Sequence, residues 1–136
     1  MAIVKGILVN DGGAPARIMN FEASEAITAG QPVSLLHVGS GDCTVQLGDS
    51  DDTTTVFMGV ALVDAASGDM CSVITGRGVV CHIKLGADVN GAVPLMLDST
   101  PGQLVAFSDG ASPVNTAPCA VTIEDGGTGL VKCMIL

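Results

Sequence analysis

The residues best suited to chemistry in this chain are its five cysteines and two histidines. The number of cysteines is odd and no two show Cys-x-x-Cys spacing, so the sequence predicts neither a zinc site nor a disulfide framework. Four of them fall within apolar strand-like runs, which is typical of small core residues with reduced thiols. The five are Cys43, Cys71, Cys81, Cys119 and Cys133.

The remaining candidates for catalysis or binding lack suitable partners. His82 falls on the polar face of an expected strand and His37 at the end of another, so both are expected to be solvated or hydrogen-bonded. The acidic loop 49–52 lacks the central Gly and distal Glu of an EF-hand. No GxSxG, HExxH, P-loop or GxGxxG motif occurs. We therefore predict that the protein is not an enzyme and has no catalytic residue, cofactor, metal or small-molecule substrate.

Charge and hydropathy exclude further classes of function. The net charge is −9, and the five basic residues are spread along the chain. Binding to nucleic acid or to an anionic membrane is therefore not expected, because both need clustered Lys and Arg. No apolar run approaches the ~20 residues of a transmembrane helix. The N-terminus lacks the basic region and cleavage site of a signal peptide, so synthesis in the cytoplasm is expected.

The elements that carry these residues are expected to be short β-strands. The segment 53–85 contains three strand-like runs separated by turn residues, and its last run, Val79–Leu85, alternates apolar and polar residues. We interpret this segment as the central meander of a small all-β, antiparallel sandwich or barrel-like domain. Aromatic residues are only 2% of the chain and the mean hydropathy is +0.57. This composition predicts an aliphatic core and an apolar surface that favours an oligomer or a docked state.

The N-terminal residues 1–25 differ from the domain expected over 26–136. The strand-prone run 3–9 is broken by turn residues from Asn10 to Pro15. One interpretation is an extended arm that adds to a sheet outside its own domain, and the other is a first hairpin of the same domain. In the first interpretation the binding residues are Ile3, Val4, Ile7, Leu8 and Val9.

The second half of the chain repeats the pattern of the first half. An ungapped shift of 61 places Gly30 on Gly91 and Gly68 on Gly129. The strand and turn order also agrees between residues 30–75 and 91–136. We therefore predict two related β units that superpose about a pseudo-two-fold axis.

Several stretches together resemble the capsid decoration proteins of tailed bacteriophages, also called cement or head-stabilising proteins. These stretches are ITAGQPVSLL from residue 27, MGVALVDAASGDMCSVITGRGVV from residue 58, GAVPLML from residue 91, and the apolar strand 130–136. The resemblance covers about residues 26–136. It implies a β-rich homotrimer on the outer capsid surface of the virion, at three-fold and quasi-three-fold positions. It also implies that the protein binds the major capsid protein, stabilises the head and has no active site.

Two other classes of function remain open from the sequence. One is a trimeric fibre-base or receptor-binding module on a virion surface, although a glycan-binding surface usually contains Trp or Tyr, and the chain has neither. The other is a small hydrolase with an unrecognised site, for which the sequence offers no paired nucleophile and base.

Overall fold

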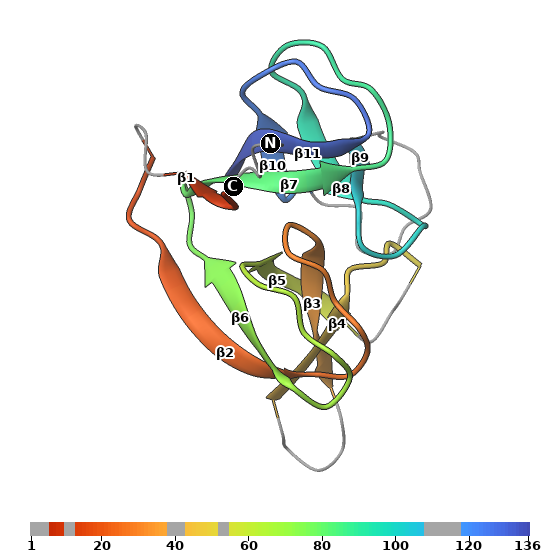
Figure 1. Cartoon of the computed structure of the whole chain (residues 1–136). Helices are drawn as coiled ribbons and strands as arrows, with labels where there is room; N and C mark the ends of the chain where they lie inside the picture. Colours follow the sequence, from red (N-terminus) through yellow and green to blue (C-terminus); the bar gives the residue numbers. More distant parts are fainter. Residues whose placement is uncertain (1–5, 10–12, 38–42, 52–54, 108–117) are drawn as a thin grey trace, which may run out of the picture.

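A computed structural model describes residues 6–9, 13–37, 43–51, 55–107 and 118–136. Throughout these ranges the chain forms β-strands, turns and loops, which confirms the all-β prediction. The strands form two closed five-stranded units, one above the other in Figure 1. Among the described residues no helix has the length and apolar character needed to cross a membrane.

The first barrel closes in the order β2-β4-β3-β5-β6. Its strands are β2 (Arg17–Ala23), β3 (Pro32–His37), β4 (Cys43–Leu47), β5 (Thr55–Ala61) and β6 (Met70–Thr75). The second barrel has the order β7-β11-β10-β8-β9 and closes through a β7–β9 pairing, and β1 (Leu8–Val9) is added to the edge of β7. Its strands are β7 (Val80–Leu85), β8 (Pro94–Leu97), β9 (Leu104–Ala106), β10 (Ala120–Thr122) and β11 (Gly129–Ile135).

The two barrels share one pairing scheme, in which β2 to β6 correspond to β7 to β11. Adding 62 to Ala23 and 59 to Val45 converts their parallel pairing into that of Leu85 with Leu104. Adding 61 to residue 60 and 60 to residue 74 converts the β5–β6 pairing into the β10–β11 pairing of residues 121 and 134. The strand offsets therefore scatter by one or two residues around 61, and the predicted repeat is confirmed as two units with the same strand pairing.

The repeat is longer than the predicted ranges 30–75 and 91–136. Each unit begins one strand earlier, at β2 or β7, and β2 lies within the segment predicted to be an arm. In the loops, the carboxylate of Asp64 accepts a hydrogen bond from the amide of Ala29, and Asp125 accepts the equivalent bond from Gly91. Gly91 therefore corresponds to Ala29, so the predicted superposition of Gly30 on Gly91 is displaced by one residue.

The predicted central meander spans both barrels instead of forming one sheet. Its three strands are present as β5, β6 and β7, but β6 pairs with β2 and β5, whereas β7 pairs with β1, β11 and β9. The chain passes from one barrel to the other at Gly76 and Gly78, whose φ angles are 121° and 79°. These left-handed conformations suit glycine. Such a turn can precede a strand that pairs with β6 or one that leaves it, so the turn does not determine where β7 pairs.

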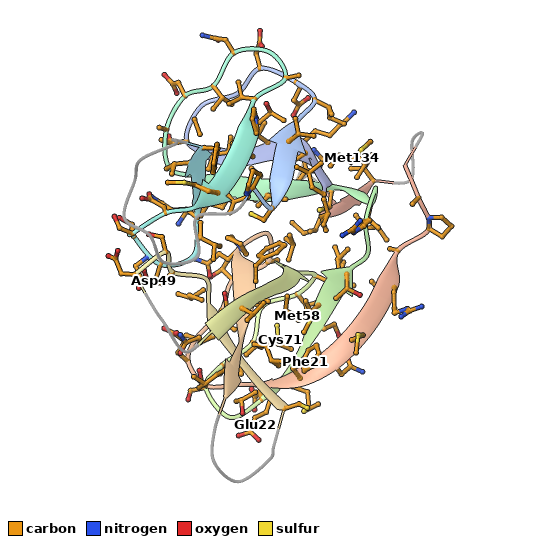
Figure 2. All side chains as sticks on the ribbon, turned by 180° about the vertical axis from the view of Figure 1, so that it is seen from behind. Phe21, Glu22, Asp49, Met58, Cys71 and Met134 are labelled. Carbon is orange, nitrogen blue, oxygen red and sulfur yellow. The ribbon has the colours of Figure 1, made fainter. Side chains whose placement is uncertain are left out.

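At one face of the first barrel, its buried side chains belong to the core of the second barrel. Figure 2 shows Phe21, Met58 and Cys71 close together within the first barrel, in its smaller apolar cluster. Val60 and Ile74 also belong to the first barrel, but they are buried in the larger cluster that fills the second. The amide of Lys84 donates to the carbonyl of Gly30 at 2.8 Å, which ties the two barrels together through their main chains.

The contact between the barrels is head-to-tail and not two-fold. Gly30 of the first barrel packs against the side chain of Leu130 in the second. A two-fold axis would place Met70, which corresponds to Leu130, against the loop that contains Gly91. Met70 is instead 61% exposed, and a β-carbon at Gly91 would have nothing within 4 Å. The predicted pseudo-two-fold axis is therefore wrong, because different faces of the two units meet.

Candidate functional site

The predicted binding segment lies on the second barrel of its own chain. Ile3 and Val4 fall outside the described residues. Ile7 is buried against the large core, and Leu8 and Val9 form β1. Figure 1 shows β1 beside β7, with which it pairs in antiparallel orientation.

Hydrogen bonds on both sides of His82 hold this segment in place. The amide of His82 donates to the carbonyl of Ile7 at 2.7 Å. The ring nitrogen Nδ1 of His82 lies 2.6 Å from the carbonyl oxygen of Gly6. His82 therefore contributes a main-chain donor and a side-chain hydrogen bond to the seat of β1, a structural role that fits the prediction of a hydrogen-bonded histidine.

In the described part of the chain, the equivalent edge of β2 is open. The amide of Ala23 donates to Asp69 on the β6 side, whereas the amide of Ser24 donates to Val45 on the opposite side. Because successive residues of a strand direct their main-chain groups to opposite sides, Ile18 and Asn20 face away from β6. Among the described residues, no strand pairs with β2 on that side at Ile18–Asn20. We call this segment the β2 edge.

Side-chain burial shows what the missing strand changes. Ile18 is 42% exposed and Met19 is 40% exposed. Their counterparts in the second barrel are Val80 and Cys81, which pair with β1 and are 1% and 0% exposed. Two adjacent apolar side chains are therefore exposed where the second barrel has the same positions covered. The adjacent apolar residues Ile18 and Met19, between the polar Arg17 and Asn20, were the sequence signal for the site. They fell within the segment 1–25 that was interpreted as either an arm or a first hairpin.

The buried cysteines offer no reactive centre. Burial raises the pKa of the Cys81, Cys119 and Cys133 thiols to about 12 and also raises the pKa of Cys71. A thiol that stays protonated is a poor nucleophile and a poor metal ligand. All five cysteines are free, and Cys43 is the exposed one.

The polar side chains of the described ranges form no metal-binding cluster. In those ranges no three His, Cys, Asp or Glu side chains are placed to hold a metal ion. The carboxylate of Asp49, labelled in Figure 2, accepts a hydrogen bond from the amide of Asp51 at 2.9 Å. Residues 49–51 of the acidic loop thus form an Asx-type turn, in which an aspartate accepts a hydrogen bond from a nearby main-chain group. The side chain of His37, the other candidate histidine, lies outside the described part.

Comparisons with known proteins place the fold among phage head proteins. No family model matches the sequence, and no curated protein matches it. The N base of head fiber gp8.5 of bacteriophage phi29 is similar in structure with a TM-score of 0.67 at 15% identity, over 90% of this chain and 95% of that chain. A chain of the capsid of Myoviridae phage XM1 has a TM-score of 0.63 at 14% identity, over 98% of this chain and 93% of that chain.

These similarities cover both barrels and nearly the whole of each similar chain. Their sequence identities are too low to carry over the role of any residue, so they establish a shared fold. Two proteins of phage heads therefore share the fold of this chain, and the sequence had been found to resemble phage decoration proteins.

Proposed function

We propose that the protein is a structural component of a tailed-phage head that binds the major capsid protein on the outside of the shell and stabilises it. The observation that carries this proposal is the fold shared, over nearly the whole chain, with two phage-head proteins.

We propose a homotrimer at three-fold and quasi-three-fold positions. Its support is the head-to-tail contact between the barrels, which leaves one face of each unit unused. The exposed Met70 corresponds to Leu130, and the exposed Ile123 corresponds to Leu62, which packs at the contact between the barrels. A head-to-tail contact repeated between chains forms a closed ring when its rotation divides a full turn. Sedimentation velocity tests this state, and a monomer at micromolar concentration would contradict it.

Of the segment 1–25 that was predicted to be an arm, we propose that β1 is the part that contributes to capsid binding. The pairing of Ile7 with His82 directs the main chain of Leu8 away from β7. A capsid strand could therefore add to the outer side of β1 while β1 remains on β7. Leu8→Pro removes only the outward N–H, which an edge strand tolerates, and it should weaken head binding without unfolding the protein.

Co-sedimentation with expanded empty heads of the phage that encodes this protein tests the main proposal. The protein should sediment with the heads at saturating, symmetry-defined stoichiometry and should raise the temperature at which they disassemble. A protein that stays in the supernatant, or heads that are no more stable with it, would contradict the proposal.

A trimeric fibre-base or receptor-binding module is the second candidate, and the similarity to a head fiber base favours it. Such a module would bind the head and also carry or contact a distal partner. Binding of the labelled protein to host cells in the absence of heads would support this candidate. Head binding without cell binding would leave the stabilising role alone.

A further inference from the structure

We propose that the β2 edge at Ile18–Asn20 receives an extended aliphatic segment of the shell protein, added antiparallel as a sixth strand of the first barrel. This inference rests on the proposed function, because the partner is the shell on which the protein sits. It identifies a second docking element on the first barrel, separate from β1, at which the shell again supplies the strand and this protein supplies the edge.

The main chain of the β2 edge has the required donors and acceptors. Ile18 and Asn20 direct their N–H and C=O groups away from β6, as Val80 and His82 do away from β11. In the second barrel these groups pair with Val9 and Ile7 of β1. Strand addition to such an edge gives affinity through main-chain hydrogen bonds and specificity through the side chains beside them.

The side chains of the β2 edge define the chemistry of the occupant. Ile18 and Met19 are exposed together, and adjacent aliphatic side chains on an unpaired strand favour an aliphatic partner. In the second barrel the strand that fills the equivalent place is Ile7-Leu8-Val9. The occupant should therefore contain two or three successive aliphatic residues in extended conformation.

The count of strands and edges in the described part of the chain favours an occupant from another kind of chain. Within these residues each copy has two equivalent edges, on β2 and β7, and supplies one β1. That β1 is already paired with β7 and held by Ile7 and Gly6. A second copy has spent its own β1 in the same way, and moving that strand would open its β7 edge. The shell protein is the partner that can supply a further strand.

The test compares two charged variants in binding to expanded empty heads. Ile18→Lys/Met19→Lys introduces charges that oppose strand addition, and both positions are already partly exposed, so the barrel should keep its fold. Val56→Lys is the matched control, because Val56 is 68% exposed on β5 of the same barrel and lies outside the β2 edge. Circular dichroism and melting temperature should match wild type for both variants.

We expect the double variant to bind heads at least about tenfold more weakly than wild type, a loss equivalent to one or two main-chain hydrogen bonds to the shell. Val56→Lys should bind as wild type does. If the double variant does not fold, Ile18→Pro takes its place, because it removes one N–H from the open side and leaves the pairing with β6 intact.

Hydrogen exchange by mass spectrometry on free and head-bound wild-type protein provides the second measurement. Peptides that contain 18–20 should become protected on heads, whereas peptides that contain 80–82 should be protected in both states. Binding of the double variant at wild-type affinity, or no added protection at 18–20, would overturn the inference and leave the proposed function in place. Wild-type protein that fails to bind heads would overturn both.

Discussion

The edges of β2 and β7 are equivalent in the two barrels but differ in what covers them. On β7, β1 covers the edge, and Val80 and Cys81 are buried. On β2, the described residues provide no such strand, and Ile18 and Met19 are exposed. The difference shows that closing a barrel does not cover the whole length of its first strand, because the part beyond the closing pairing remains an available edge until another segment pairs with it.

The two barrels also differ at their buried positions. Gly59 in β5 corresponds to Ala120 in β10, and the two pair with the equivalent residues Val33 and Leu95. Thiols with a pKa of about 12 occur at three places in the second barrel, whereas the first has one buried thiol, Cys71. Identical pairing thus coexists with different packing, and the following changes test which differences matter.

Raising the pH should lower the free energy of unfolding more than any of the substitutions below, because the effects of three buried thiols of the second barrel add together. In the unfolded chain they ionise near pH 9, whereas in the folded chain they ionise near pH 12. Their contribution to stability is therefore complete below pH 9 and is lost as the pH rises toward 12. Each thiol can remove up to about 1.4 kcal/mol per pH unit in this window.

Urea unfolding at pH 8 and pH 10.5 measures this loss. Cys133→Ala lowers stability at both values because it leaves a cavity, but it should reduce the pH dependence by the share of one thiol. An unfolding free energy that stays constant between the two pH values would contradict the assignment of buried, neutral thiols to this barrel.

Gly59→Ala should destabilise the protein by about 3 kcal/mol, because overpacking against a rigid main chain cannot relax easily. A β-carbon at position 59 would overlap the carbonyl oxygen of Ile74, although alanine is accommodated at the equivalent Ala120. The matched control is Gly6→Ala, where a β-carbon would meet nothing within 4 Å. Chemical denaturation gives both values, and equal stability of the two variants would show that the barrels tolerate alanine alike.

Gly30→Ala should cost about 2 kcal/mol and Gly91→Ala about 1 kcal/mol, since both residues have left-handed φ angles that disfavour a β-carbon. The angles are 91° and 77°. The excess at Gly30 comes from contact with Leu130 across the two barrels, so it should shrink in a Leu130→Ala background. Thermal melts of wild type, the two single variants and the double variant measure the coupling, and strict additivity would argue against the contact.

Ser34→Ala should have the smallest effect, between no change and about 1 kcal/mol of stabilisation. The side chain of Ser34 is fully buried and its hydroxyl has no hydrogen-bond partner among the described residues, so burial of this polar group is uncompensated by them. In the second barrel the equivalent residue is the apolar Met96. A clear loss of stability in urea unfolding would reveal a partner for this hydroxyl.

The sequence predicted the strands and the repeat because both depend on local patterns. Alternation along 79–85 identified β7, and glycine-rich turns separated most of the other strands. The common spacing near 61 also followed from these turns. The division into barrels was not predictable in the same way, because the turn at Gly76 and Gly78 has the same composition whether β7 pairs with β6 or leaves it.

The candidate site was harder to predict because an open edge is defined by what fails to pair. Phe21 and Ala23 mark β2 as a barrel strand through their burial, but burial depends on partners distant in the chain. The same limit applies to β1, since Leu8 and Val9 are strand-prone residues whose partner, β7, lies about seventy residues away. Whether residues 1–25 form a hairpin or an arm therefore could not be decided from these residues alone.

Amide hydrogen exchange at Asn20 and His82, followed by NMR on the free protein, tests the central claim most directly. Asn20 lies on the β2 edge, and His82 lies at the equivalent position on the edge of β7 that β1 covers. The amide of Asn20 points away from β6, and the amide of His82 points away from β11. We predict slow exchange at His82, whose amide donates to Ile7 at 2.7 Å, and fast exchange at Asn20. Equal protection of the two amides would mean that the β2 edge is already filled, and it would contradict the account.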